Sequence, residues 1–304
     1  MTALLDRPVK LRTFAGVGLR RRVTDSIATV LVTFAMILAL VPLVWVMYTV
    51  FDFGFGAVST SSWWTHSQAG MTAFVAGGGA YHAIVGTLLQ GLLCAAISIP
   101  IGIFVAIYLV EYGGGTRLGK LATFMVDILT GVPSIVAALF VYALWVATLG
   151  FHRSGFAVSL SLVLLMVPVI VRATEEMLRI IPMDLREASY ALGAPKWKTI
   201  TSIVIPTALS GIVTGILLAL ARVMGETAPL LILVGYSQAI NFDMFHGFMG
   251  SLPGMMYDQT SAGAGASAVP TDRLWGAALT LILLIALLNV AARFGARIFA
   301  PKKF

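Results

Sequence analysis

The chain has 304 residues, of which 59% are hydrophobic and only 11% are charged, and its formal net charge is +7. Together with a mean hydropathy of +0.95, these fractions exclude an ordinary soluble globular domain. In so apolar a chain the placement of the positive charges matters more than their sum, so the basic excess does not indicate nucleic-acid binding.

Six apolar runs have about the 20 residues or more that cross a bilayer. They lie at 27–50, 82–110, 121–149, 155–175, 207–234 and 274–292. The sequence therefore predicts an all-α, polytopic membrane protein with six transmembrane helices. The first run is longer than the apolar core of a typical signal peptide, and no small-residue cleavage site follows it, so we expect a retained first helix.

Lys and Arg gather on alternate connections between these runs. They lie before the first run, between the second and third, between the fourth and fifth, and after the sixth, whereas loops 51–80 and 235–272 contain none. The positive-inside rule therefore predicts that both termini are cytoplasmic. We expect a basic cytoplasmic segment at 1–26, a six-helix domain at 27–298 and a cytoplasmic tail at 299–304.

No residue pattern indicates a catalytic site, a metal or a bound cofactor. Gly114 to Lys120 has the spacing of a phosphate-binding P-loop, but Leu121 stands where Ser or Thr would ligate magnesium. The four histidines lack metal-ligand spacing. We therefore expect the chain not to hydrolyse ATP itself.

The connection at about 176–206 predicts two short helices. Asp184 and Glu187 have the spacing of a capping box, and Gly193 fits the position just after the first helix. A second apolar stripe at helical spacing follows. We expect this second helix to lie along the membrane surface and to lead through Pro206 into the fifth span.

The same connection carries a longer pattern of fixed spacing. It consists of Glu187, Ala188 and Ser189, then Gly193, Ile203, Ile205 and Pro206. The pattern resembles the EAA loop of bacterial ABC importer permeases, from which only Ser189 and Ile205 depart. The alternative is a well-capped surface helix, which does not require the long spacing.

In that family the EAA loop transmits the motion of a cytoplasmic ATPase to the membrane helices. The resemblance therefore implies an ATPase-coupling loop at 183–206. Its coupling residues would be Glu187, Ala188, Gly193, Ile203 and Pro206.

Four further segments carry a narrower pattern. They are TGVPSIVAALF (130–140), VPVIVRATEEMLRIIP (167–182), LREASYALGAPKWKTI (185–200) and GILLALARVMGETAPLL (215–231). They resemble the phosphate-specific ABC permeases, in particular the PstA type, and ARVMGETAP is the most discriminating stretch. The resemblance implies a type I importer fold in the bacterial inner membrane and inward transport of inorganic phosphate by alternating access.

The resemblance also implies partners and the place of the cofactor. The partners are a homologous PstC-type permease subunit, a PstB-type ATPase dimer and a PstS-type phosphate-binding protein outside. ATP and magnesium would be bound by the ATPase dimer and not by this chain. Membrane lipid surrounds the chain, and no nucleic acid is expected.

Arg222 and Glu226 lie deep in the fifth apolar run, where an unpaired charge costs several kcal/mol. They are four residues apart, so we expect them to lie on one helical face and to reach each other. Two interpretations stay open: a buried ion pair that fixes packing, or a substrate pathway in which Arg222 donates to an oxyanion and Glu226 holds or releases it. Gly225 and Pro229 predict a bend or local unwinding. Thr227 adds a hydroxyl that serves either the pathway or its own backbone.

Arg172 lies near the predicted cytoplasmic end of the fourth run. Its position fits a side chain that reaches the interface, and its place in VRATEEML leaves a pathway role open. Asp127, in the third run, fits a structural role. The predicted pathway residues are therefore Arg172, Arg222, Glu226 and Thr227.

Two other functions compete with that of an ATP-driven permease. A secondary transporter would use Glu226 as a proton carrier, and a scaffold or sensor would use the loop only to recruit a regulator. The EAA-like loop argues against the first of these. Whether phosphate contacts Arg222 directly stays open.

Overall fold

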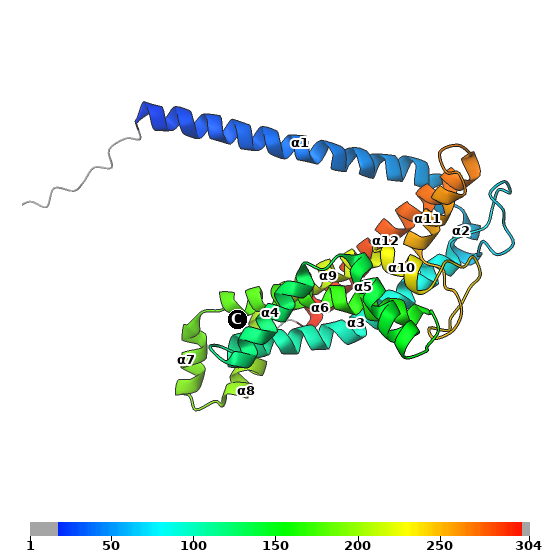
Figure 1. The fold of residues 1–304 in the computed structure, drawn as a ribbon. Coiled ribbons are helices and arrows are strands. Elements are labelled where there is room, and N and C mark those ends of the chain that lie inside the picture. The colour runs from blue at the N-terminus through cyan, green and yellow to red at the C-terminus, as the bar shows by residue number, and fades with distance from the viewer. Residues whose placement is uncertain (1–17, 300–304) are drawn as a thin grey trace, which may run out of the picture. The chain divides into compact units, whose positions relative to one another are not determined.

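The computed structural model describes residues 18–299, which contain helices and connecting loops but no strand. The predicted basic segment up to residue 17, and the tail from residue 300, lie outside this range. In chain order (Figure 1) the elements are α1 (Leu19–Val58), α2 (Ser61–Thr65), α3 (Tyr81–Ile107), η1 (Tyr108–Tyr112), α4 (Arg117–Thr130), α5 (Ser134–Val141), η2 (Tyr142–Thr148), α6 (Gly155–Ile180), α7 (Met183–Ala191), α8 (Lys196–Thr199), η3 (Ile200–Val204), α9 (Ile205–Met224), α10 (Ala228–Leu233), α11 (Leu252–Ser261) and α12 (Ala268–Phe299). The η segments are π-helical.

The chain divides into two units, residues 1–49 and 50–304. The described part of the first unit is the beginning of α1, a helix whose most apolar window has none of its residues buried. Leu31, Phe34 and Trp45 are among its exposed apolar side chains. Because water would penalise so much exposed apolar surface, this helix is suited to lipid or to another membrane chain.

The core of the second unit is formed by α3, α6 and α9, which lie side by side. Small residues allow close approach: a Cβ at Gly102 of α3 would lie 2.6 Å from Ile170 Cγ2 of α6. A Cβ at Gly215 of α9 would lie 2.5 Å from the Ala173 Cβ of α6. Small residues at such contacts are a common way for membrane helices to pack closely.

Within residues 18–299, five helices are long and apolar enough to cross a membrane, and the number rises to six if a bent pair of helices counts as one span. The bent pair replaces the predicted third span. Arg117–Thr130 and Ser134–Thr148 meet at 108°, so the predicted third span, 121–149, is bent and not one continuous helix. The physical cause is Gly131-Val132-Pro133, because proline cannot donate to a continuing helix and restricts the residue before it.

The predicted fifth span is also divided differently. The helix begins at Lys196, well before residue 207, and continues through η3 and α9 to Met224. The expected surface helix is therefore part of this longer helix, and Pro206 lies in the first turn of α9, where proline is tolerated. The chain then breaks before α10.

Helix α7 begins without the predicted capping box. Pro182 stands at its N-cap, where no side-chain hydrogen bond forms, and Asp184 lies in the first turn, next to the positive end of the helix dipole. The predicted helix end is confirmed, because Gly193 follows with φ +78°, a conformation that favours glycine. Its N–H donates to Tyr190 O at 2.9 Å.

Candidate substrate path and coupling loop

One face of α9 is exposed along its length and carries polar groups. Ser210, Thr214, Leu218 and Arg222 follow each other at intervals of four residues, and all four are exposed. The opposite face, which includes Ile212, is buried against the rest of the unit. Because an arginine facing lipid costs several kcal/mol, this stripe is suited to water or protein rather than to hydrocarbon.

Arg222 and Glu226 do not form the helical pair that the spacing predicted. Helix α9 ends at Met224, and the N–H of Gly225 turns back to Arg222 O at 3.2 Å. The ion pairs found among residues 18–299 do not include these two side chains. The pairing is therefore wrong because the helix ends between them, whereas the predicted unwinding at this point is confirmed.

Thr227 stands at the start of the short helix that follows the break. It occupies the N-cap of α10, and its hydroxyl makes no capping hydrogen bond. Its backbone carbonyl accepts from the N–H groups of Leu230 and Leu231, at 3.1 and 3.3 Å. Thr227 and Glu226 are both half-buried, whereas Arg222 is exposed.

Glu226 lines a small cavity of about 10 Å³ beside the break. The cavity lies between α3, α6, the end of α9 and the start of α11. Its polar lining residues are Thr87, Gln90, Glu226 and Ser251. Gln90 is only 2% exposed, and its Nε2 has no hydrogen-bond partner among the described residues. Gln90 is not among the predicted pathway residues, although an amide inside the apolar run 82–110 is a signal of a buried polar site.

Arg172 belongs to a different cluster. Its guanidinium pairs with Asp127 of α4 and, at 2.7 Å, with Glu175 of its own helix. Glu175, which is almost fully buried, also accepts from Arg179 at 2.5 Å. The structural role predicted for Asp127 fits this link between α4 and α6. Within the described residues, none of these contacts joins Arg172 to Arg222, Glu226 or Thr227.

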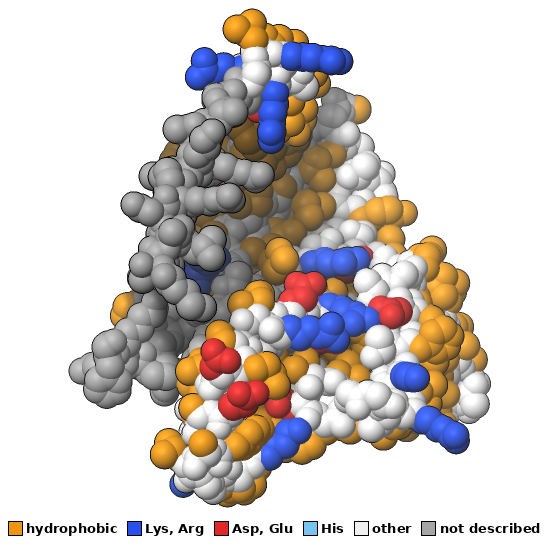
Figure 2. Space-filling view, turned by 90° about the vertical axis from the view of Figure 1, so that its left-hand side faces the viewer, with side chains coloured by type: hydrophobic (Ala, Val, Ile, Leu, Met, Phe, Trp, Pro, Cys, Tyr) orange, Lys and Arg blue, Asp and Glu red, His pale blue; other side chains and the backbone are white. Residues whose placement is uncertain are grey.

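The five predicted coupling residues fall into two groups. Glu187, Ala188 and Gly193 are exposed, whereas Ile203 and Pro206 are half-buried where the long helix begins. Leu192, just before Gly193, is 89% exposed, and Trp197, between the two groups, is 63% exposed. Such isolated large apolar side chains on a polar loop suit contact with another protein. Charged side chains of both signs also gather on this end of the second unit (Figure 2).

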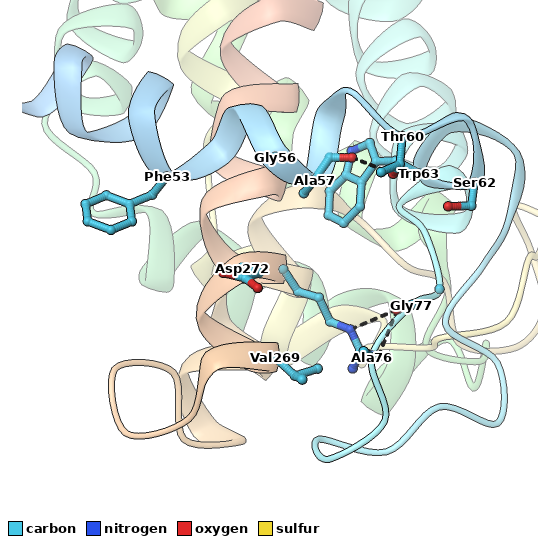
Figure 3. Close-up of a pocket in the computed structure, with 12 residues that line it drawn as sticks. Phe53, Gly56, Ala57, Thr60, Ser62, Trp63, Ala76, Gly77, Val269 and Asp272 are labelled. Carbon is cyan, nitrogen blue, oxygen red and sulfur yellow. Dashed lines mark hydrogen bonds between the residues drawn. The ribbon is translucent and has the colours of Figure 1, made fainter.

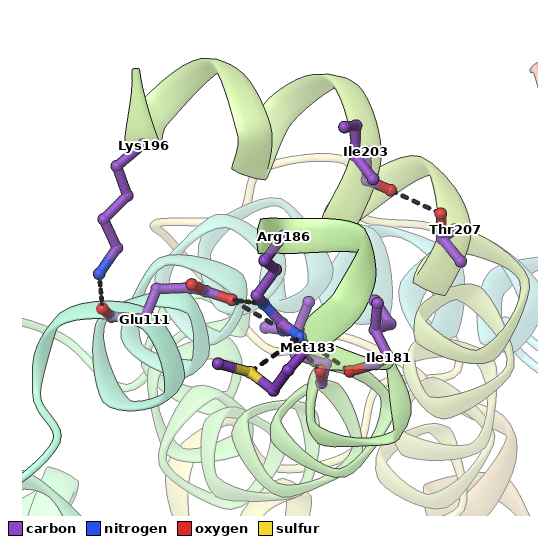
Figure 4. Close-up of polar contacts among 8 residues, drawn as sticks. Glu111, Ile181, Met183, Arg186, Lys196, Ile203 and Thr207 are labelled. Carbon is purple, nitrogen blue, oxygen red and sulfur yellow. Dashed lines mark hydrogen bonds and ion pairs between the residues drawn. The ribbon is translucent and has the colours of Figure 1, made fainter. Parts of the chain in front are cut away.

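A buried ion pair attaches the loop to the rest of the unit (Figure 4). Arg186 of α7 pairs with Glu111 of η1 at 2.9 Å, and the two side chains are 7% and 6% exposed. Arg186 also donates to the carbonyls of Ile181 and Leu178, at 2.8 and 3.0 Å. The guanidinium is therefore satisfied in a nearly dry site, which fixes α7 against the end of the α3–η1 helix.

Two further contacts hold the second half of the loop. Lys196 donates to Glu111 O, and its ammonium lies 4.6 Å from the centre of the Tyr112 ring. Ser189 and Thr199 share a buried hydrogen bond of 2.8 Å between α7 and α8. The loop is thus fixed to the membrane-spanning helices.

At the other end of the second unit, Arg273 organises a loop beside a cavity of about 320 Å³ (Figure 3). The guanidinium donates to the carbonyls of Thr72, Val75 and Gly77, at 3.1, 2.7 and 2.9 Å. Because the guanidinium nitrogens of Arg273 donate to these backbone carbonyls, its role here is to hold the loop in place. Nearby, burial raises the pKa of Tyr236, whose hydroxyl lies 2.9 Å from His82 Nε2.

Comparisons with known proteins agree with this architecture. A family model described as "Binding-protein-dependent transport system inner membrane component" matches residues 98–304. The chain is 56% identical over 288 residues to "Phosphate transport system permease protein PstA 1" of Mycobacterium tuberculosis, covering 95% of this chain and 93% of that protein. It is 53% identical over 292 residues to "Phosphate transport system permease protein PstA" of Mycobacterium leprae, covering 96% and 94%.

A solved structure shows the same fold. It is a chain of a bacterial alginate ABC transporter in complex with an alginate pentasaccharide-bound periplasmic protein, with a TM-score of 0.62, 15% identity, and coverage of 94% of this chain and 99% of that one. The protein is therefore a multi-pass membrane protein. It belongs to the family of binding-protein-dependent transport system inner membrane components.

Proposed function

We propose that the chain is the PstA-type permease subunit of an ATP-driven importer of inorganic phosphate. The observation that carries the proposal is 56% identity across 95% of the chain to a protein named as a phosphate transport permease. The chain supplies half of the translocation path and one docking loop. It does not hydrolyse ATP itself.

In the proposed assembly, partner subunits cover two surfaces that are exposed in this chain, the polar stripe of α9 and the loop at 183–206. A PstC-type permease covers the polar stripe of α9, so that Ser210, Thr214 and Arg222 face an aqueous path and not lipid. A PstB-type ATPase dimer binds ATP and magnesium and contacts the loop at 183–206. A PstS-type protein delivers phosphate from outside the bacterial inner membrane.

The placement of positive charges supports an orientation in which the loop at 183–206 and both termini are cytoplasmic. ATP binding would then close the ATPase dimer on this loop. Because α8, η3 and α9 form one continuous helix, a displacement at Gly193 or Trp197 would reach Arg222 along a stiff element.

In the path itself, Arg222 presents a fork of N–H donors to a phosphate oxygen. Glu226 and Thr227 lie in the half-buried break just beyond it, on the side away from the cytoplasmic loop, and would contact the incoming ion before Arg222. Arg172 would take part only if it exchanged its contacts with Asp127 and Glu175, so we assign it the weakest role of the four.

The test is phosphate uptake by proteoliposomes that hold the whole complex, with ATP enclosed and loaded binding protein outside. Arg222→Ala should lower the initial rate at least about a hundredfold while the complex still assembles, because the donor to the ion is lost. The matched control is Leu218→Ala, one turn earlier on the same exposed face, which should keep the rate within about twofold.

Three outcomes would contradict the proposal in different ways. A normal rate for Arg222→Ala combined with Glu226→Ala would assign the two charges to packing. Uptake driven by a proton gradient without ATP would indicate a secondary transporter. No uptake by the original complex at any ATP concentration would indicate a scaffold or sensor.

A further inference from the structure

Gln90 is a buried donor for which the folded chain provides no acceptor. It lies on α3, its side chain is 2% exposed, and its Nε2 makes no hydrogen bond among the described residues. An unpaired buried polar group costs about 1–3 kcal/mol. Such a group in a native protein therefore needs an explanation.

The amide lines the cavity that also receives Glu226. The space beside it is narrow: a Cβ added at the neighbouring Gly91 would lie 3.3 Å from Met224 Cγ, so α3 lies close to the end of α9 there. Its volume of about 10 Å³ is the space of a single water molecule and is too small for a tetrahedral anion.

The walls of this cavity can separate because one of them is the break between α9 and α10. Helix α9 ends at Met224 and α10 begins at Ala228, so the residues between them, including Glu226, lack continuous helical hydrogen bonding. The facing wall is held more firmly, since Thr87 Oγ1 accepts the N–H of Leu252 at 2.8 Å. A movement of α9 would therefore widen the cavity on the side of Glu226.

We propose that this cavity is a phosphate site in the translocation path, with Gln90 as an unassigned substrate-binding residue. An amide donor facing a carboxyl acceptor suits a tetrahedral oxyanion that keeps a proton. Hydrogen phosphate offers bare oxygens to Gln90 Nε2 and a P–OH group to Glu226. The carboxyl group then accepts a hydrogen bond from the ion rather than only repelling it. This inference rests on the proposed function.

The deciding variant is Gln90→Met, which keeps the length and approximate volume of the side chain but removes its polar atoms. If the amide serves only packing, uptake should stay unchanged, because Nε2 has no partner in the folded chain. If Gln90 binds the ion, ATP-driven phosphate uptake should fall at least about tenfold, the effect of one hydrogen bond to a charged group. The melting temperature should stay the same or rise, because an unpaired buried group is removed.

The matched control is Gln259→Met. Gln259 is also a glutamine of 2% exposure with an unpartnered side-chain atom, Oε1, but it lies on α11 and does not line this cavity. Its replacement should leave uptake within about twofold. An equal loss in both variants would show that burial of a methionine causes the defect and would overturn the inference.

A double-variant cycle tests whether Gln90 and Glu226 hold the same ion. Glu226→Leu removes the acceptor, whereas Glu226→Gln keeps an oxygen that accepts from P–OH and should retain more uptake. Combining Gln90→Met with Glu226→Leu should reduce uptake by less than the product of the single effects. Independent effects that multiply would overturn the shared site.

The same measurements separate this inference from the function on which it rests. An original complex that takes up no phosphate overturns both. An original complex with ATP-driven uptake, together with normal uptake by Gln90→Met, overturns the role of Gln90 alone.

Discussion

Arg186 is a buried residue of the loop at 183–206, and its carboxylate partner is Glu111, 75 positions earlier in the chain. The pair is buried on both sides, so each charge depends on the other for its place in the fold. The sequence displayed both residues but contained no sign of their contact, because an ion pair between distant segments has no local periodicity. This ion pair attaches the loop at 183–206, through α7, to η1 at the end of the α3 helix.

Glu111→Ala should therefore destabilise the protein by about 3–5 kcal/mol, because it leaves the Arg186 guanidinium buried without a counter-charge. The measurement is thermal unfolding of the detergent-solubilised chain. Glu111→Leu combined with Arg186→Met should recover most of the loss, since neither charge is then buried. Asp243→Ala, which removes exposed contacts with the His246 ring and with the N–H groups of Phe245 and His246, is the control and should lower the melting temperature far less. A small effect of Glu111→Ala would mean that the pair does not hold the loop.

At the scale of elements, the break between α9 and α10 decides what Arg222 and Glu226 can do. Gly225 and Pro229 made unwinding predictable, because glycine is a weak helix former and proline removes a donor. The pairing of the two charges was inferred from a continuous helix and failed at the same glycine. The Gly225 and Pro229 positions thus predicted the break correctly. The surroundings of Glu226 were not predictable from them, because they are formed by residues of α3, α6 and α11.

Gly225→Ala should stiffen this break. The added Cβ meets its nearest neighbour, Arg222 O, at 3.6 Å, and the φ of −93° is open to alanine, so the change is tolerated. It favours continuation of the helix by about 1 kcal/mol. We expect slower phosphate uptake with an unchanged or higher melting temperature, measured in the same proteoliposomes. Gly295→Ala in α12, where a Cβ meets nothing within 4 Å, also favours its helix but lies far from the break in the chain, and it should leave the uptake rate unchanged. A normal uptake rate for Gly225→Ala would show that the break is rigid during transport.

At the scale of the whole molecule, the exposed surfaces divide by chemistry. The helices expose apolar side chains suited to lipid, the loop at 183–206 exposes Leu192 and Trp197 among charges, and the connection after α10 exposes Phe242. The proposed orientation places the loop and Phe242 on opposite sides of the membrane. Only one of these surfaces can then meet a cytoplasmic ATPase.

Leu192→Asp should therefore abolish co-purification of the ATPase with the permease pair, because a charge replaces an apolar side chain that is 89% exposed for contact. Phe242→Asp is the matched control, since it places the same charge at an exposed apolar position on the other side. Its complex should keep the ATPase. Loss of the ATPase from Phe242→Asp but not from Leu192→Asp would reverse the orientation.

The membrane class, the apolar segments, the resemblance of the loop at 183–206 to a coupling loop and the weak point at Gly225 could all be predicted from the sequence. These features depend on composition, charge placement and short-range spacing, which are local properties of the chain. Four relationships between side chains became known only from the packing of the helices. Arg222 and Glu226 form no ion pair with each other, whereas Arg172 pairs with Asp127 and Arg186 pairs with Glu111. Gln90 and Glu226 line the same cavity. Each of these relationships depends on which helices, distant in the sequence, pack against each other. Close packing through small side chains determines those neighbours, and it leaves no periodic pattern along the sequence.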